Sequence, residues 1–92
     1  MHVRVKAFGP LRTLTGADGE QIELPTGATL ADLLRWIGEH WAERLPPSAW
    51  NTREHRFRGP VVVRVGAQIV RDRATVLADG QEVGIHQALV GG

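Results

Sequence analysis

The segment from Thr29 to Trp41 constrains the fold most, because it carries the clearest helical pattern in the chain. Its apolar side chains recur at helical spacing and form one stripe: Leu30, Leu33, Leu34, Ile37 and Trp41. Thr29, followed three residues later by Asp32, predicts a capping box at the N-terminus. Gly38 interrupts the helix at a cost of about 1 kcal/mol relative to alanine, and Leu45-Pro46-Pro47 ends it. One amphipathic helix needs an apolar surface to cover.

Segments with the period-two alternation or the β-branched composition of strands lie on both sides of this helix. The expected strands are 3–7, 21–24, 61–65, a short return at 68–70, and 82–86. A helical crossover lets the first and last strands pair in parallel at the centre of a sheet. The order predicts an α+β fold, a β-grasp roll in which a mixed sheet of four to five strands packs on one main helix.

Size and composition exclude several classes of function. The 92 residues suit one domain, 1–92, whose core is too small for a deep internal cleft. Eleven Lys and Arg against ten Asp and Glu give a net charge of +1, which argues against a dedicated nucleic-acid binder. No apolar run approaches the roughly 20 residues of a membrane span. With no cysteine and no signal-peptide pattern at the start, the expected location is cytoplasmic.

The stretch from Pro46 to Pro60 is the least patterned part of the chain and is predicted to be a long loop. Its basic residues are Arg53, His55, Arg56 and Arg58. A solvated loop is the favoured interpretation, and a surface for an acidic partner is the alternative. Packing at the edge of the core is expected for Trp36 and for Trp50, although exposed tryptophan also anchors interfaces.

The sequence gives little support for metal binding, serine catalysis or nucleotide binding. Four histidines are scattered without metal-ligand spacing, so no metal site is expected: His2, His40, His55 and His86. Ser48, the only serine, lies in no nucleophile-elbow context. No Gly-x-x-x-x-Gly-Lys segment is present to hold a nucleotide, so no bound cofactor is expected and ATP should belong to a partner.

The chain ends in Val90-Gly91-Gly92, and a tail from about residue 87 is expected to be flexible. Two terminal glycines place no side chain beside the terminal carboxylate, so bare backbone can enter a narrow channel. Activated as a mixed anhydride with AMP, the carboxylate can accept sulfur or be attacked by an amine. A frayed terminus is the simpler alternative for the dipeptide taken alone.

Three segments resemble the small subunit of molybdopterin synthase, a ubiquitin-like sulfur carrier. They are Phe8-Gly9-Pro10-Leu11-Arg12-x-Leu14-Thr15-Gly16, then Gly27-Ala28-Thr29-Leu30-Ala31-Asp32-Leu33-Leu34, and the closing Leu77-Ala78-Asp79-Gly80-Gln81-Glu82-Val83 with Gly91-Gly92. Their order and their spacing from the C-terminus match across the chain, except in the loop from Pro46 to Pro60. The sequence departs from the family at three places. Gln87-Ala88-Leu89 stands where two prolines and a valine are usual, and His86 stands where an apolar or aromatic residue is common. The turn Val65-Gly66-Ala67 often reads Val-Asn-Gly in the family.

The resemblance implies a β-grasp fold and a defined chemistry. An ATP-dependent activating enzyme would adenylate Gly92, sulfur transfer would give a thiocarboxylate, and Gly91 would provide clearance. The thiocarboxylate would deliver sulfur within the molybdopterin synthase large subunit, in molybdenum cofactor biosynthesis, without the chain being a catalyst. Related carriers serve cysteine, thiamine or secondary-metabolite sulfur transfer. A modifier conjugated through Gly92 and a non-covalent interaction domain with an inert tail are the other hypotheses.

Overall fold

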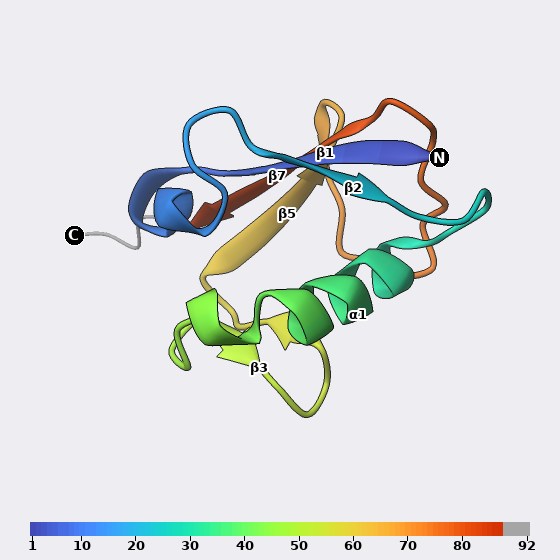
Figure 1. Ribbon diagram of the computed structural model, residues 1–92. Coiled ribbons are helices and arrows are strands. Elements are labelled where there is room, and N and C mark those ends of the chain that lie inside the picture. Colours follow the sequence, from blue (N-terminus) through green and yellow to red (C-terminus); the bar gives the residue numbers. More distant parts are fainter. Residues whose placement is uncertain (88–92) are drawn as a thin grey trace.

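A computed structural model describes residues 1–87, in which a mixed sheet lies over one main helix (Figure 1). The elements in chain order are β1 (His2–Ala7), η1 (Gly9–Leu14), β2 (Glu20–Glu23), α1 (Leu30–His40), η2 (Ala42–Arg44), β3 (Trp50–Asn51), β4 (Arg56–Phe57), β5 (Val61–Val65), β6 (Gln68–Ile69) and β7 (Glu82–Gln87). The two η elements are short 3₁₀ helices. This architecture confirms the predicted β-grasp class.

The main sheet has five strands in the order β2-β1-β7-β5-β6. The first and last strands, β1 and β7, are parallel neighbours, and β7 is the central strand, as the sequence predicts. Every other side chain of β1 enters the core: Val3, Val5 and Ala7 are buried, whereas Lys6 lies on the opposite face. One face of the sheet therefore packs on α1, and no helix of residues 1–87 lies across the other face (Figure 1).

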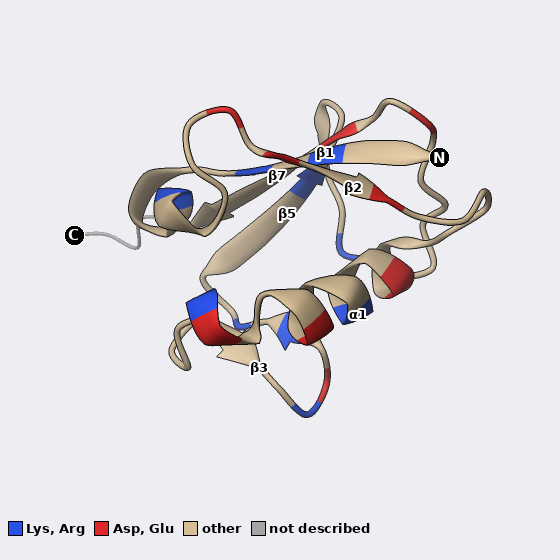
Figure 2. Ribbon diagram, in the orientation of Figure 1, with Lys and Arg blue, Asp and Glu red and all other residues tan. Residues whose placement is uncertain are grey.

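Helix α1 begins with the predicted capping box. The Thr29 N–H donates to Asp32 Oδ2 at 2.8 Å, and the Asp32 N–H donates to Thr29 Oγ1 at 3.3 Å. The Asp32 carboxylate accepts from the Thr29 N–H and also from Thr29 Oγ1 at 3.1 Å, and these two hydrogen bonds, the backbone one first, lower the pKa of the Asp32 carboxyl. Leu30, Leu33 and Leu34 face the sheet with Ile37, and the charged residues lie on the side of α1 turned away from it (Figure 2).

The helix ends at His40, earlier than the Leu45-Pro46-Pro47 boundary predicted from the prolines. Trp41 leaves the helical conformation at φ −113° and ψ 15°, and its side chain is buried in the core. A turn of 3₁₀ helix, η2, then connects it to Leu45, which is also buried. The apolar stripe thus continues past the helix because its last members anchor the connecting turn.

The segment predicted to be a long loop contains a two-stranded antiparallel sheet, β3 and β4, which corrects that prediction. Trp50 pairs with Phe57, and their rings meet edge to face with centroids 4.9 Å apart. Both side chains are buried, so the hairpin closes one end of the core. A strand of two residues is too short to show a period-two alternation, so the sequence pattern could not predict it.

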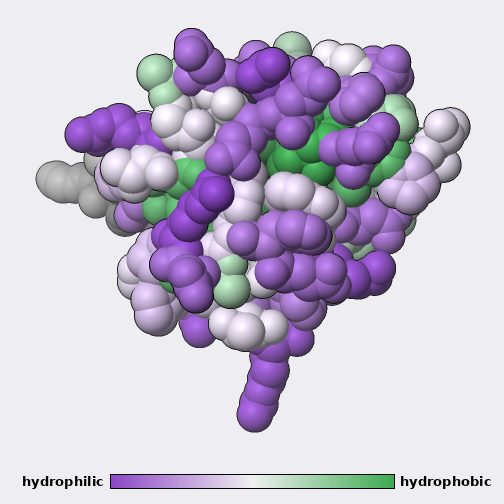
Figure 3. All heavy atoms as spheres, in the orientation of Figure 1, coloured by the Kyte–Doolittle hydropathy of each residue, from purple (hydrophilic) through white to green (hydrophobic). Residues whose placement is uncertain are grey.

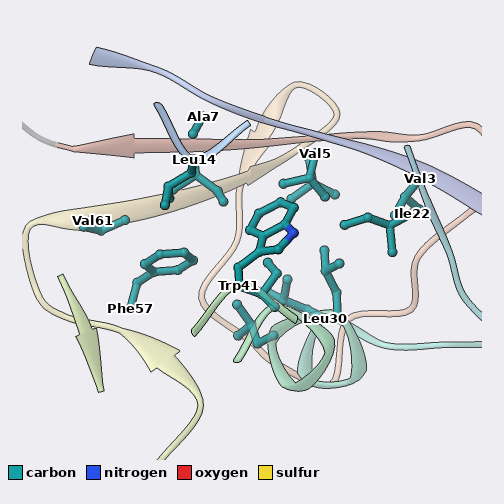
Figure 4. Packing of buried hydrophobic residues seen from close by; sticks show 14 of the residues in the cluster. Val3, Val5, Ala7, Leu14, Ile22, Leu30, Trp41, Phe57 and Val61 are labelled. Carbon is teal, nitrogen blue, oxygen red and sulfur yellow. The ribbon is translucent and has the colours of Figure 1, made fainter. Parts of the chain in front are cut away.

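The outside of the molecule is mostly hydrophilic in the view of Figure 3, with small hydrophobic areas. Inside, the Trp41 ring lies between the sheet, α1 and the hairpin (Figure 4). It is 1% exposed, and it is the largest of the fully buried side chains. In the described residues 1–87, no helix has the length and apolar character needed to cross a bilayer.

Candidate functional site

The predicted reacting residues Gly91 and Gly92 lie outside the described residues, so the structure bears on them through the strand that precedes them. That strand, β7, pairs with β1 on one side and β5 on the other, and its final residue, Gln87, lies opposite Val61. Gln87, which the sequence assigned to the tail, is thus part of the sheet. Residues 88–92 therefore continue from the central strand, whose end lies near η1 (Figure 1).

Alternation along β7 gives the strand two different faces. Val83 and Ile85 are buried against the helix side, and Glu82, Gly84 and His86 lie on the open face. A Cβ at Gly84 would collide with the Arg64 guanidinium and with the His86 ring. Glycine at this position therefore lets the Arg64 side chain lie across β7.

Four side chains, one each from β1, β5 and β7 and one from the residue after β1, form a cluster on the open face near the end of β7. The Phe8 and His86 rings stack with centroids 4.4 Å apart and planes 3° from parallel. Arg64 Nε donates to His86 Nε2 at 3.2 Å, so we assign the imidazole proton to Nδ1. Lys6 Nζ lies 5.2 Å from the Phe8 ring centroid, within cation–π range. Phe8, His86, Arg64 and Lys6 are named here the open-face cluster.

Electrostatics hold His86 neutral within this cluster. Desolvation lowers the pKa of the His86 imidazole, the positive charge of Arg64 lowers it further, and Glu82 opposes both. Arg64 Nη2 also donates to Glu82 Oε1 at 2.9 Å, and that hydrogen bond lowers the pKa of the Glu82 carboxyl. At neutral pH the cluster presents a planar ring stack flanked by the cations of Lys6 and Arg64. Such a surface is suited to recognising a partner that combines apolar and acidic groups.

The predicted basic loop does not behave as one solvated segment. Arg53, Arg56 and Arg58 are exposed, but the His55 ring turns inward, and its buried Nδ1 has no hydrogen-bond partner among the described residues. A Cβ at Gly38 would lie 2.6 Å from that Nδ1, so the hairpin rests on the helix where the helix has no side chain. Gly38 has low helix propensity, but its lack of a side chain lets the β3–β4 hairpin pack against α1.

The other residues singled out by sequence take structural positions. Trp50 is buried, and Trp36 is partly buried, with its ring stacked on His40 at 4.1 Å between centroids. Ser48 is exposed. Within residues 1–87, the structure brings no three His, Cys, Asp or Glu side chains into an arrangement that could hold a metal ion.

Sequence reasoning missed the open-face cluster as a unit. The alternation Val5-Lys6-Ala7-Phe8 places Lys6 and Phe8 on one face, and β7 places Glu82 and His86 on one face. Only the parallel register, which pairs Ala7 with Ile85, shows that these two faces coincide near Phe8 and His86.

Comparison with known proteins assigns a family to the chain from residue 5 onward. The model of the ThiS family matches residues 5–92. The chain belongs to the ThiS family. That match confirms the ubiquitin-like sulfur-carrier resemblance drawn from the sequence, and its range includes Gly91 and Gly92. A comparison with curated proteins found no match.

Several solved structures share this fold. SAMP1 of Haloferax volcanii has a TM-score of 0.78 at 18% identity, over 100% of both chains. A Pyrococcus furiosus protein assigned as molybdopterin converting factor subunit 1 has a TM-score of 0.69 at 30% identity, over 96% of this chain and 98% of that one. One chain of the complex of subunits 1 and 2 of the molybdopterin-converting factor from Helicobacter pylori has a TM-score of 0.68 at 21% identity, over 100% of this chain and 100% of that one.

Proposed function

We propose that this ThiS family protein carries sulfur as a thiocarboxylate on Gly92 and delivers it in molybdopterin biosynthesis. The single observation that supports the proposal most is the family match, which runs through the terminal Gly91-Gly92. The choice of pathway is supported by the 30% identity to the Pyrococcus furiosus protein assigned as molybdopterin converting factor subunit 1. The partner would be a sulfur-accepting large subunit, of the kind that accompanies subunit 1 in the Helicobacter pylori complex.

The chemistry needs two steps in a partner enzyme. The Gly92 carboxylate attacks the α-phosphorus of ATP, which forms an acyl-adenylate and releases pyrophosphate. A sulfide equivalent supplied by the partner then attacks the acyl carbon and expels AMP, so that a carbon–sulfur bond replaces the acyl carbon–oxygen bond of the mixed anhydride. The chain contributes the acyl group and its delivery, and the partner contributes ATP and the catalytic groups.

The position of Gln87 supports the delivery of Gly92 to a partner, because Gln87 is the last residue of the central strand. Residues 88–92 follow Gln87, which is held in the central strand opposite Val61. At no more than about 3.6 Å per residue, five residues extend at most about 18 Å beyond the sheet. The open-face cluster beside the end of β7 would contact the partner while the terminal glycines reach the reaction centre.

Intact mass spectrometry tests the proposal directly. The full chain is incubated with an adenylating enzyme, Mg-ATP and sulfide, and we expect the mass change of one oxygen replaced by sulfur. A chain lacking Gly91 and Gly92 is the control and should not change mass. An unmodified wild-type chain with a demonstrably active adenylating enzyme would contradict the carrier function.

The pathway is tested separately from the carrier chemistry. The thiocarboxylate form, mixed with a molybdopterin synthase large subunit and its pterin precursor, should yield molybdopterin and return a carboxylate. A thiocarboxylate that forms but transfers sulfur only to a cysteine or thiazole precursor would retain the carrier role and reject the molybdopterin role. Recovery of Gly92 in an isopeptide bond to a lysine of another protein would support a modifier, a role compatible with the SAMP1-like fold.

A further inference from the structure

A groove lies beside β5, away from the open-face cluster, and the proposed sulfur chemistry does not use it. It has a volume of about 320 Å³, within the range of sites that bind ligands. Its apolar floor includes Leu30 and Leu34 of α1, Val63 of β5, and Val70 just after β6. Leu30 and Leu34 belong to the core, so the floor of the groove is the outer edge of that core.

Four arginines from two distant segments surround this floor: Arg56, Arg58, Arg71 and Arg73. All four are exposed. The chain as a whole carries a net charge of only +1, so this concentration of positive charge is local. Because the floor is apolar and the rim is cationic, the groove suits a ligand that combines aliphatic and acidic groups.

Nearby carboxylates neutralise little of the rim. Glu54 Oε2 lies 3.6 Å from Arg56 Nε in an exposed pair, which is a weak interaction in water. Asp72 directs Oδ1 to the backbone N–H of Ala74 at 2.9 Å. Arg73 Nη1 donates to the Glu54 carbonyl at 3.1 Å. Arg71 has no ion pair or hydrogen bond to any other residue between 1 and 87, so its charge is available to a ligand.

The edge of β5 along this groove also offers backbone groups. Val63 is paired with Ile85, whose carbonyl accepts from the Phe8 N–H on the far side of β7, so Val63 directs its own backbone groups toward the groove. The Val63 carbonyl accepts from the Val70 N–H at 2.9 Å. The Val63 N–H and the Val61 carbonyl have no backbone partner in the described part of the chain. One residue of an added parallel strand would satisfy both.

We propose that this groove binds an extended segment of a partner protein in which acidic side chains flank an aliphatic residue. The aliphatic side chain would lie on Leu30 and Leu34, the acidic ones would pair with Arg71 and its neighbours, and the main chain would bond to the β5 edge. Single-stranded nucleic acid fits less well, because the groove's only aromatic ring, Phe57, is 9% exposed and offers no stacking surface. The proposal does not depend on the fate of Gly92.

Peptide titration tests it on the full chain. The probe is acetyl-Glu-Asp-Ile-Val-Asp-Glu-amide with a fluorophore, and the control peptide replaces its acidic residues by Gln and Asn. We expect binding of the acidic peptide, and about tenfold weaker binding by Arg71→Glu. Arg12→Glu makes the same charge change at an exposed site outside the groove and should leave the affinity within twofold.

Hydrogen exchange followed by NMR locates the contact. Saturating acidic peptide should slow exchange of the Val63 amide, because that N–H gains a partner, and at the same concentration the peptide should slow it markedly less in Arg71→Glu. Equal binding of both peptides, equal binding by Arg71→Glu, or an unchanged Val63 amide would overturn the proposal. Tighter binding of a single-stranded DNA oligonucleotide than of the peptide would overturn it in favour of nucleic acid.

Discussion

Replacing Gly38 by alanine should destabilise the protein, although the same change usually stabilises a helix. Alanine is favoured over glycine inside a helix by about 1 kcal/mol. Here the new Cβ would lie 2.6 Å from His55 Nδ1 and 3.1 Å from Trp50 Cζ2, and both side chains belong to the hairpin segment that closes the core. Overpacking of this kind typically costs about 1–3 kcal/mol. The net expectation is a loss of up to about 2 kcal/mol in the free energy of unfolding.

Two further variants identify the cause. In the background of His55→Ala, the closer contact is gone, so Gly38→Ala should cost less, and the difference is the coupling between the two sites. Gly59→Ala is the control for adding a methyl group, because no atom lies within 4 Å of its Cβ and its backbone conformation is ordinary. Urea unfolding monitored by circular dichroism gives the free energies, and a loss of 1 kcal/mol lowers the Tm by about 4–8 °C in a domain of this size.

A Gly38→Ala protein more stable than the wild type would refute the reasoning. So would a cost of Gly38→Ala that is unchanged by removing His55, because the hairpin would then not be seated on this glycine.

Three other changes test separate parts of the structure. Thr29→Ala removes the capping box and should lower the free energy of unfolding by about 1 kcal/mol, measured by urea unfolding; an unchanged midpoint would contradict the cap. Trp41→Ala removes the largest fully buried side chain and should cost about 3–5 kcal/mol in the same assay, and a loss below 1 kcal/mol would argue against its central position. Folding lowers the pKa of His86, so the unfolded chain takes up a proton first as the pH falls below the ordinary value of 6.5. The contribution of His86 is therefore complete above that value and is lost as the pH falls through its folded pKa. His86→Phe keeps an aromatic ring beside Phe8 and should show a shallower fall in stability over this range, and an identical pH profile would refute the assignment.

The sequence predicted the parts of the fold that depend on periodic patterns. The helix was predictable because its apolar residues repeat at helical spacing and Thr29 and Asp32 define its start. The parallel central pair followed from the order of elements, because a helical crossover brings the first and last strands together. These elements could be predicted because their sequence patterns are strongly periodic or follow directly from the order of elements.

The remainder depends on contacts between segments that are distant in the chain. The β3–β4 hairpin is stabilised by the contact of Trp50 with Phe57 and by its seat on Gly38, and no local repeat announces either contact. Arg56 and Arg71 reach one groove only because the segment that follows β6 returns to α1, where the Thr75 carbonyl accepts from the Leu30 N–H at 2.9 Å. Gly91 and Gly92 could be nominated from chemistry alone, and they remain a prediction.

The register of β7 determines which of its residues fill the core, which lie in the open-face cluster, and where Gln87 ends the strand. A slip of one residue would place Glu82, Gly84 and His86 in the core and Val83 and Ile85 on the open face, so the buried surface strongly selects the observed pairing. The same pairing sets Gln87 opposite Val61, and a slip would change the reach of the residues beyond it by about 3.3 Å. The proposed carrier function needs a fixed point from which Gly92 can reach a catalytic centre in another protein. In this chain the hydrophobic core fixes that point, because the residues that hold the register are the ones that fill the core.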